Sequence, residues 1–231
     1  MCAEPLISVV LPCLNEEKSL PGCLQEIKST CETAGLRYEI VVADNLSTDK
    51  SAEIARQFGA RVATVTRRGY GACVQGGLSA AEGDILVFGD ADGSYPFSEI
   101  PNLVAPIVQD KADLVLGNRL NNKLQKGAMP FLNHYLGTPV LSAVLRWIHH
   151  IPVYDCNGGL RALRKTAWQK LDLRQPGMEY ASEMLIEAAK KHLRYQEVNI
   201  GLRQTDANRQ PHLRPWRDGW RHLKIIVKGK F

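Results

Sequence analysis

Two aspartates separated by one residue, Asp90 and Asp92, are the feature of this sequence best suited to chemistry. They follow the apolar run 85–88, which has the composition of a buried strand. Carboxylates in such a place can hold a hard divalent cation, because Mg²⁺ commonly binds one or two carboxylates together with phosphate oxygens of a substrate. A solvated acidic turn is the alternative for a D-x-D pair taken alone.

Three further polar clusters also follow apolar strand-like runs. They are PCLNEE at 12–17, DNLSTD at 44–49 and GNR at 117–119. In open α/β sheets ligands bind beyond the carboxyl ends of the strands, so the four clusters are expected to converge on one crevice. Other readings stay open: Asn15 and Glu16 could cap a helix, and Asp44 could form an Asx-turn.

The elements that must position these clusters alternate between strand and helix. Strands are predicted at 6–11 (ended by Pro12), 38–43, 61–66, 84–89 and 113–117, and helices at 18–33, 48–58, 70–83 and 98–109. The glycines of RRGYGA at 67–72 either form a turn or allow the backbone to approach a nucleotide. This order predicts βαβ units in one α/β domain, with a mainly parallel central sheet flanked by helices.

The second half of the chain predicts fewer strands. Helices are expected at 131–149, 179–191 and from Trp216 onward, with β character in 155–163 and 195–200. Glu179 and Glu183 share one helical face, and a structural role is favoured for both. We expect one domain over 1–205, with a donor half (1–117) and an acceptor half (118–205), followed by a basic amphipathic segment at 206–231.

Composition excludes several classes of protein. The 231 residues are 45% hydrophobic and 23% charged, which is typical of globular chains and unlike disordered or coiled-coil ones. The six cysteines lack metal-ligand spacing, so reduced thiols are expected. The start MCAEPLISVVLP has no basic residues before its apolar stretch and indicates a first strand, not a signal peptide.

Positive charge is concentrated at the carboxyl end. Residues 201–231 contain eight Lys or Arg and two Asp, a net charge of +6 in a chain of net charge +5. With Trp216 and Trp220, this segment fits a helix lying on an anionic membrane surface, although a surface helix packed on the body is the alternative. Nucleic-acid binding is not expected, because no aromatic stacking platform accompanies the charges.

Taken in order, PCLNEE, VVADNLSTDKS, RRGYGA, GDADGSYP and GNR resemble family 2 glycosyltransferases of the GT-A fold. The later segments DCNGGLRALRK, GMEYASEM and RPWRDGWRHL resemble the dolichyl-phosphate mannose synthase-like branch. The resemblance implies an enzyme that moves a sugar, with inversion, from a nucleotide-diphosphate sugar to a polyprenyl phosphate. It also implies a cytoplasmic protein, peripheral on the inner face of the membrane.

The resemblance assigns roles to residues at matching positions. Asp90 and Asp92 match the pair that binds Mg²⁺ or Mn²⁺, with Asp92 favoured as the direct ligand, and Arg119 matches an arginine beside the donor phosphates. The positions matched to nucleotide-sugar binding are Pro12, Asn15, Glu16, Asp44, Asp90 and Ala91. The positions expected to meet an acceptor phosphate are Lys123, Lys126, Arg209 and His212.

This sequence departs from the family pattern at four positions. Leu14 stands where relatives often carry Tyr, Ala43 replaces an acid, Leu46 replaces a Gly, and Ser94 replaces a Gln that can join the metal shell. These departures bear on base recognition and metal geometry and leave Asp90 and Asp92 intact.

Other functions were weighed against this one. A hydroxyl acceptor would need a general base, for which Asp155 is the candidate, although Asp155 could instead cap or bridge to Arg161. A nucleotidyltransferase is disfavoured because PCLNEE is acidic where a basic phosphate loop would lie. A nicotinamide enzyme is disfavoured because RRGYGA does not fit G-x-G-x-x-G. A non-catalytic membrane module would not need the retained acids.

Overall fold

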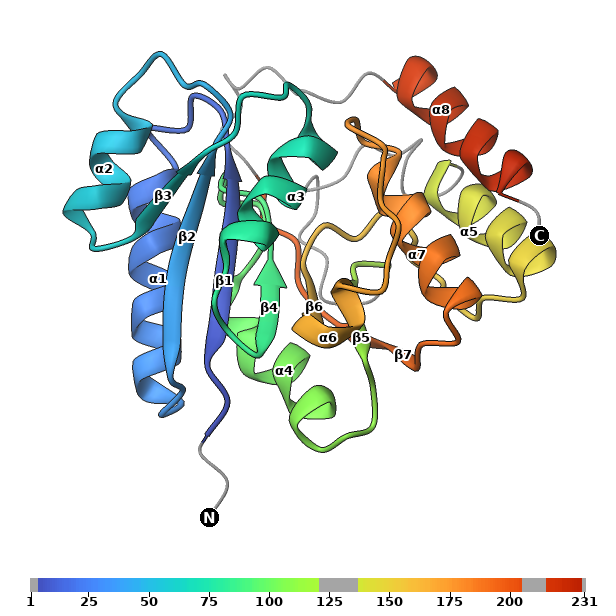
Figure 1. Ribbon diagram of the computed structural model, residues 1–231, viewed down its shortest axis with the longest axis horizontal. Helices are drawn as coiled ribbons and strands as arrows, with labels where there is room; N and C mark the ends of the chain where they lie inside the picture. Colours follow the sequence, from blue (N-terminus) through green and yellow to red (C-terminus); the bar gives the residue numbers. More distant parts are fainter. Residues whose placement is uncertain (1–3, 121–136, 205–214, 230–231) are drawn as a thin grey trace.

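A seven-stranded sheet forms the centre of the molecule (Figure 1), in a computed structural model that describes residues 4–120, 137–204 and 215–229. The strand order is β3-β2-β1-β4-β6-β5-β7. The strands are β1 (Ile7–Cys13), β2 (Tyr38–Asp44), β3 (Arg61–Thr64), β4 (Ile85–Phe88), β5 (Leu114–Asn118), β6 (Arg161–Arg164) and β7 (Tyr195–Asn199). Parallel pairing joins β3, β2, β1 and β4, and also β5 with β7, whereas β6 runs antiparallel between β4 and β5. The prediction of a mainly parallel α/β sheet is confirmed.

Helices connect the strands and cover both faces of the sheet. They are α1 (Leu20–Thr33), α2 (Ser51–Gln57), α3 (Tyr70–Ala80), α4 (Ile100–Val108) preceded by the 3₁₀ turn η1 (Phe97–Glu99), α5 (Thr138–His149), α6 (Lys165–Trp168), α7 (Tyr180–Lys190) and α8 (Pro215–Lys228). One core layer packs α1 and α4 on the sheet, through Leu24, Ile27 and Leu103 among others. The other packs α3, α5, α7 and α8 on the opposite face. Burial on both faces explains why β1 is apolar at nearly every position.

The first strand runs further than the sequence suggested. Pro12 was expected to end it, but β1 continues to Cys13. Gly89 N donates to Val10 O, which shows that the backbone N–H and C=O groups of even-numbered β1 residues point toward β4. The pairing with β4 covers only Ile7–Val10. Pro12 therefore lies beyond that pairing, where its missing N–H costs no ladder hydrogen bond.

The carboxyl ends of β1, β2, β4 and β5 point to the same edge of the sheet, since these four strands share one direction. Cys13, Asp44, Gly89 and Asn118 mark those ends. The polar clusters that follow them are therefore brought to one edge, as expected.

The carboxyl-terminal helix α8 packs on the body. His222 and Ile226 are buried, and α8 lies beside α5 and α7 (Figure 1). Within the described ranges no helix combines the length and apolarity that a membrane span requires.

The glycines of the 67–72 segment allow it to pack closely against another part of the chain. Gly69 has φ +123°, and Ala72 N donates to Pro176 O at 3.2 Å. A Cβ on Gly71 would stand 2.5 Å from Gln175 O and 2.6 Å from Tyr180 Cβ. The absence of a side chain lets the start of α3 touch the segment 175–177, which leads into α7.

Gly71→Ala should therefore lower the free energy of unfolding by about 1–3 kcal/mol, because an added methyl group must displace backbone. Gly22→Ala is the matched control, since Gly22 lies in α1 with nothing within 4 Å of its would-be Cβ. That variant should stabilise the protein by roughly 0.5–1 kcal/mol through helix propensity. Urea unfolding of both variants measures the difference, and equal shifts would contradict the close contact.

Candidate active site

The first two strand-end loops hold each other through hydrogen bonds in which at least one partner is a side chain. Asn15 Oδ1 accepts hydrogen bonds from Thr48 N at 2.8 Å and Thr48 Oγ1 at 3.3 Å. Ser47 Oγ accepts from Asn15 N at 3.0 Å, and Ser51 Oγ accepts from Glu16 N at 2.8 Å. Asn15 thus joins the two loops, and its own φ of 58° lies in the left-handed region. The loops that carry Asn15, Glu16 and Asp44 form one unit at the sheet edge.

Asp44 and Glu16 also make the local contacts that the structural alternatives anticipated. Asp44 Oδ1 accepts from Ser47 N at 3.3 Å, an Asx-type contact. Glu16 O accepts from the N–H groups of Ser19 and Leu20 at the start of α1, and Ser19 Oγ donates to Glu16 Oε2 at 2.9 Å. Both acids are more than nine-tenths buried. These contacts fix where the two acidic side chains lie.

Leu46 occupies the position where relatives often have glycine, and the backbone explains that preference. Its φ is 66°, a left-handed conformation that glycine adopts freely and a leucine adopts at a cost. Its side chain is also 36% exposed. The loop therefore adopts at Leu46 a backbone conformation that a glycine would favour.

The loop after β4 carries Asp90 and Asp92. Asp92 Oδ1 accepts from Ser94 N at 2.9 Å, and Gly93 between them has φ +78°. Arg203 N donates to Ser94 O at 2.8 Å, while the Arg203 guanidinium pairs with Glu26 on α1. The segment after β7 and α1 therefore brace the D-x-D loop from outside.

Asp90 faces a group of aromatic hydroxyls. A Cβ on Gly159 would lie 3.1 Å from Asp90 Oδ2 and 3.0 Å from the Tyr95 hydroxyl oxygen. Both groups therefore lie next to the backbone of Gly159, where a side chain would displace them. Burial, followed by the charge of Asp90 and a hydrogen bond to it, raises the pKa of Tyr70 well above its usual value. Tyr70 and Tyr95 therefore stay protonated beside the carboxylate.

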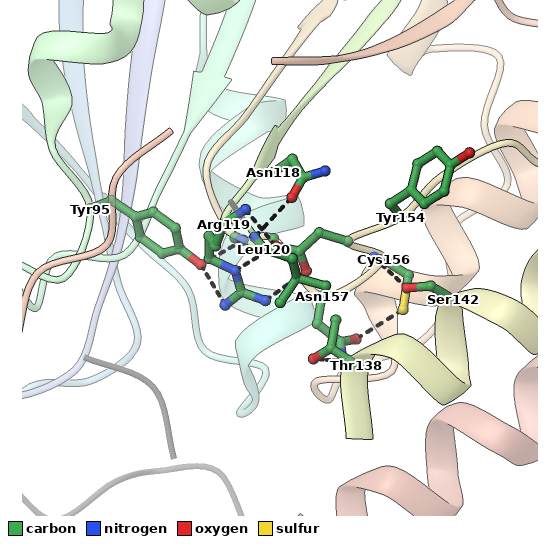
Figure 2. Close-up of polar contacts among 12 residues, drawn as sticks. Tyr95, Asn118, Arg119, Leu120, Thr138, Ser142, Tyr154, Cys156 and Asn157 are labelled. Atoms are coloured by element: carbon green, nitrogen blue, oxygen red, sulfur yellow. Dashed lines mark hydrogen bonds and ion pairs between the residues drawn. The ribbon is translucent and has the colours of Figure 1, made fainter. Parts of the chain in front are cut away.

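Arg119, directly after β5, is held in place by Tyr95 (Figure 2) and by Asp155. Asp155 accepts from Arg119 Nε at 2.7 Å and from Nη2 at 2.8 Å, and also from the Arg119 backbone N–H at 2.9 Å. Tyr95 OH accepts from Arg119 Nη1 at 3.2 Å and from Gly159 N at 2.7 Å. The Asp155 side chain is 0% exposed and that of Arg119 is 12% exposed. The guanidinium orientation is thus fixed from two sides.

Charge pairing controls protonation in this group. Burial alone would raise the pKa of Asp155, but the adjacent Arg119 and its hydrogen bonds hold that pKa below the usual value. Burial alone would lower the pKa of Arg119, and the Asp155 carboxylate raises it instead. Burial raises the pKa of Tyr95 to about 12. At neutral pH the group is a carboxylate, a guanidinium and a neutral phenol.

The loop that carries Asp155 also connects the site to α5. Cys156 N donates to Ser142 Oγ at 3.1 Å, and Asn157 Nδ2 donates to Thr138 Oγ1 at 3.3 Å (Figure 2). On its other side, Glu197 of β7 accepts from Asp155 N at 2.8 Å. The first turns of α5 therefore lie against the segment that holds Arg119.

Several expected contacts turn out differently. Arg161, proposed as a structural partner of Asp155, instead donates to the carbonyls of Gly158, Cys156 and Ala181. Glu183 accepts from the backbone N–H groups of Arg174 and Gln175, which supports the structural role favoured for it. Glu179 lies 3.9 Å from Arg221 of α8. Four of the sequence-predicted residues, Lys123, Lys126, Arg209 and His212, lie outside the described residues.

A divalent cation fits the carboxylates that the structure places at this edge. Among the described residues, no group of three His, Cys, Asp or Glu side chains could enclose a metal ion. Asp90 and Asp92 supply two carboxylates, and Mg²⁺ commonly completes such a shell with water and substrate phosphate. When bound, the cation neutralises negative charge on the leaving diphosphate. The residues that would hold it are Asp92 and Asp90.

A seven-stranded mixed α/β sheet with a carboxylate pair after β4 defines a transferase of the GT-A fold. The chain belongs to glycosyl transferase family 2, whose family model matches residues 8–168. It is similar to crystal structures of glucosyl-3-phosphoglycerate synthase from Mycobacterium tuberculosis, one of them in complex with Mn²⁺ and uridine diphosphate. That structure has a TM-score of 0.74 and 27% identity, over 98% of this chain and 79% of the other. Another structure of that synthase holds Mg²⁺ and uridine diphosphate. The chain is therefore a family 2 glycosyltransferase, and these structural neighbours were crystallised with Mn²⁺ or Mg²⁺.

Curated relatives extend the similarity. The low-salt glycan biosynthesis hexosyltransferase Agl6 of Haloferax volcanii is 36% identical over 225 residues, covering 96% of this chain and 53% of the relative. This chain thus spans about half the length of that relative. A dolichyl-phosphate hexose transferase of the same organism is 30% identical over 224 residues, covering 96% of this chain and 92% of the relative. An undecaprenyl-phosphate 4-deoxy-4-formamido-L-arabinose transferase of Aeromonas hydrophila is 34% identical over 137 residues, covering 55% of this chain and 42% of the relative.

Tyr95 and Gly159 are parts of the site that sequence reasoning missed. Tyr95 lies within GSYP immediately after the D-x-D pair, so an aromatic hydroxyl at a strand end was a readable signal. Gly159 is one of 19 glycines in the chain, and nothing local distinguishes it, because its role depends on contact with residues far away in sequence.

Asp155→Asn should lower the free energy of unfolding by about 3–5 kcal/mol at pH 7, because it leaves the buried Arg119 charge without its partner. The lowered pKa of Asp155 gives stability that is present above its unfolded pKa, about 3.9, and is lost as pH falls through the folded value. The difference between wild type and variant, measured by urea unfolding, should therefore shrink in acid.

The control is Asp172→Asn, which breaks the exposed ion pair between Asp172 and Arg174. It should leave the unfolding midpoint nearly unchanged at every pH, since exposed pairs contribute little. A difference for Asp155→Asn that stays constant down to pH 3 would contradict the ionised pair.

Asp92→Asn should reduce sugar-transfer turnover by on the order of 100-fold and weaken Mn²⁺-dependent nucleotide binding, while the unfolding midpoint changes little. Steady-state rates and calorimetric titration of uridine and guanosine diphosphate with Mn²⁺ measure both effects. Asp172→Asn serves again as the control carboxylate. Wild-type turnover that persists in excess chelator would overturn the metal assignment.

Proposed function

We propose that this protein transfers a sugar, with inversion at the anomeric carbon, from a nucleotide-diphosphate sugar to a polyprenyl phosphate on the cytoplasmic face of the membrane. The donor lies along the paired loops that carry Pro12, Asn15 and Asp44. Its diphosphate lies beside Arg119, and Asp90 and Asp92 would hold a divalent cation there. The remaining question is how the acceptor oxygen becomes a nucleophile.

The state of Asp155 carries this proposal. A hydroxyl acceptor needs a general base, and Asp155 was the candidate. Its carboxylate is fully buried and accepts three hydrogen bonds from Arg119 at 2.7–2.9 Å. Its lowered pKa also makes it a weak base. Such a carboxylate is suited to holding Arg119 and poorly suited to taking a proton from an acceptor.

A phosphate acceptor removes the need for that base. The second pKa of a phosphate monoester is about 6, so its oxygen is already anionic at neutral pH. In this arrangement Asp155 positions Arg119, and Arg119 stabilises the negative charge that develops on the leaving diphosphate. Asp90 and Asp92 would hold the divalent cation that offsets the charge of the donor phosphates. Each side chain then has one task that its contacts permit.

Relatives support the lipid acceptor. Two of them are named as transferases that act on dolichyl phosphate or undecaprenyl phosphate. One crystal structure of the neighbour glucosyl-3-phosphoglycerate synthase contains phosphoglyceric acid, which favours a second candidate in which the acceptor is a small hydroxyl compound. The basic residues Lys123, Lys126, Arg209 and His212 are proposed to bind the acceptor phosphate in the first case.

The acceptor is tested by comparing a water-soluble short-chain prenyl phosphate, the matching prenol and phosphoglyceric acid under identical conditions. We expect transfer to the prenyl phosphate and little to the prenol. Arg209→Ala should raise the KM for prenyl phosphate by roughly tenfold or more, the equivalent of a lost charge-assisted contact of about 1.5–3 kcal/mol. The KM for the nucleotide sugar should change little.

Arg56→Ala, at the exposed Arg56 of α2, is the control for loss of positive charge. Equal transfer to the free prenol would contradict the lipid-phosphate assignment. Transfer to phosphoglyceric acid alone would instead establish the second candidate.

A further inference from the structure

The exposed apolar side chains of the described residues gather on two neighbouring helices. Seven large hydrophobic residues are well exposed, and four of them belong to α5 or α8. On α5, Trp147 is 79% exposed and Val140 is 48% exposed. On α8, Trp220 is 61% exposed and Val227 is 52% exposed. Two tryptophans this exposed have no role in the core, so they point to a surface that they bind.

Helical spacing places the members of each pair on one side of their helix. Val140 and Trp147 are seven residues apart on α5, with the partly buried Val144 between them. Trp220 and Val227 have the same spacing on α8, with the partly buried Leu223 between them. Residues at i, i+3 or i+4, and i+7 form one stripe along a helix.

The way α8 is attached sets the two stripes side by side. Its far flank faces α7, where Arg221 lies 3.9 Å from Glu179 and His222 Nδ1 is hydrogen-bonded to Ser182 Oγ at 2.7 Å. On the side toward α5, His149 Nε2 of α5 donates to Ile226 O at 2.7 Å, while Trp220 and Val227 remain exposed on the outside of α8. Since α5 and α8 lie next to each other on the right of Figure 1, their exposed stripes belong to neighbouring elements of the surface.

Basic side chains accompany the stripe on α8. Arg217, Lys224 and Lys228 are exposed, and Arg217 and Lys224 are one turn on either side of Trp220. A second copy of this chain would bring the same positive charges against themselves, and like charges across an interface are unfavourable. An anionic lipid surface instead pairs with the charges, while its interfacial zone accepts tryptophan.

We propose that α5 and α8 together form a docking face for an anionic membrane, in which Trp147 of α5 is an anchor equal in importance to Trp220 of α8. This docking face comprises Val140, Trp147, Trp220, Leu223, Val227 and the three basic residues of α8. It rests on the proposed lipid acceptor, and it goes beyond a membrane-binding carboxyl-terminal segment by including a helix from within the transferase fold.

The docking face is connected to the site by hydrogen bonds. The first turns of α5 are bound through Thr138 and Ser142 to Asn157 and Cys156, and the preceding Asp155 holds Arg119. A membrane against α5 therefore lies next to the segment that orients the proposed catalytic arginine.

The first experiment measures binding to vesicles by sedimentation. Vesicles of phosphatidylcholine alone are compared with vesicles that contain phosphatidylglycerol. We expect binding only to the anionic vesicles, weakened by salt and weakened roughly tenfold by either Trp147→Ala or Trp220→Ala, a change of about 1.4 kcal/mol. Val108→Ala, at a 54% exposed valine of α4, is the apolar control and should bind like wild type.

Two matched double variants test the contribution of positive charge to vesicle binding. Lys224→Gln with Lys228→Gln should weaken binding to anionic vesicles, whereas Lys111→Gln with Lys170→Gln, at exposed lysines elsewhere on the fold, should not. Full binding by Trp147→Ala would overturn the shared docking face, because α8 alone would then be sufficient. Vesicle-independent dimers that become monomers in the tryptophan variants would also overturn it, since the face would then be a self-interface.

A second readout separates this inference from the proposed function. With a water-soluble short-chain prenyl phosphate, the two tryptophan variants should retain wild-type kcat/KM. With a long-chain polyprenyl phosphate in anionic vesicles, they should lose roughly tenfold in kcat/KM, in line with their binding. Equal loss with both acceptors would contradict docking. Absence of transfer to any prenyl phosphate by wild type would refute the function, while the vesicle measurements would still decide the docking face.

Discussion

The buried ion pair between Arg119 and Asp155 is the interaction on which the rest of the site depends. A guanidinium that is 12% exposed and a carboxylate that is 0% exposed are stable there only because each satisfies the other. Asp155 belongs to a loop that contacts β7 through Glu197 and α5 through the neighbouring Cys156 and Asn157. Arg119 in turn contacts Tyr95, which stands at the D-x-D loop. Displacing this one pair would disturb the D-x-D loop, β7 and α5 together.

The parts of the fold that depend on local sequence could be predicted. Apolar runs bounded by turn residues identified the strands, and the strand-end polar clusters indicated the shared edge of the sheet that carries Asp44, Asp90 and Arg119. The antiparallel course of β6 could not be inferred, since a four-residue strand has no pattern that encodes its direction. The partner of Asp155 was also out of reach from sequence, because Arg119 is 36 residues away and competes with the much nearer Arg161. Arg161 proved to be a structural cation that satisfies backbone carbonyls.

The carboxyl-terminal helix shows how one amphipathic pattern can serve two surfaces. Its sequence suggested either a membrane helix or a helix packed on the body. In the structure, one side of α8 is packed, through the buried His222 and Ile226, while Trp220 and Val227 remain outside. The exposed Trp220 and Val227 thus lie on a different side of α8 from the residues that pack on the protein. The apolar surface of α8 therefore extends further around the helix than its packing against α5 and α7 requires.

The position of β6 has a consequence for how the chain folds as it is synthesised. Residues 161–164 lie between β4 and β5, so β5 and β7 have no place in the sheet until the chain has been made past residue 164. Until then the β4 edge of the amino-terminal half is open, and open edges pair readily with other chains. A ribosome that pauses before this point would hold a nascent chain whose four parallel strands are complete and whose next partner is missing. Chaperone dependence and co-translational aggregation should therefore concentrate in that window of synthesis.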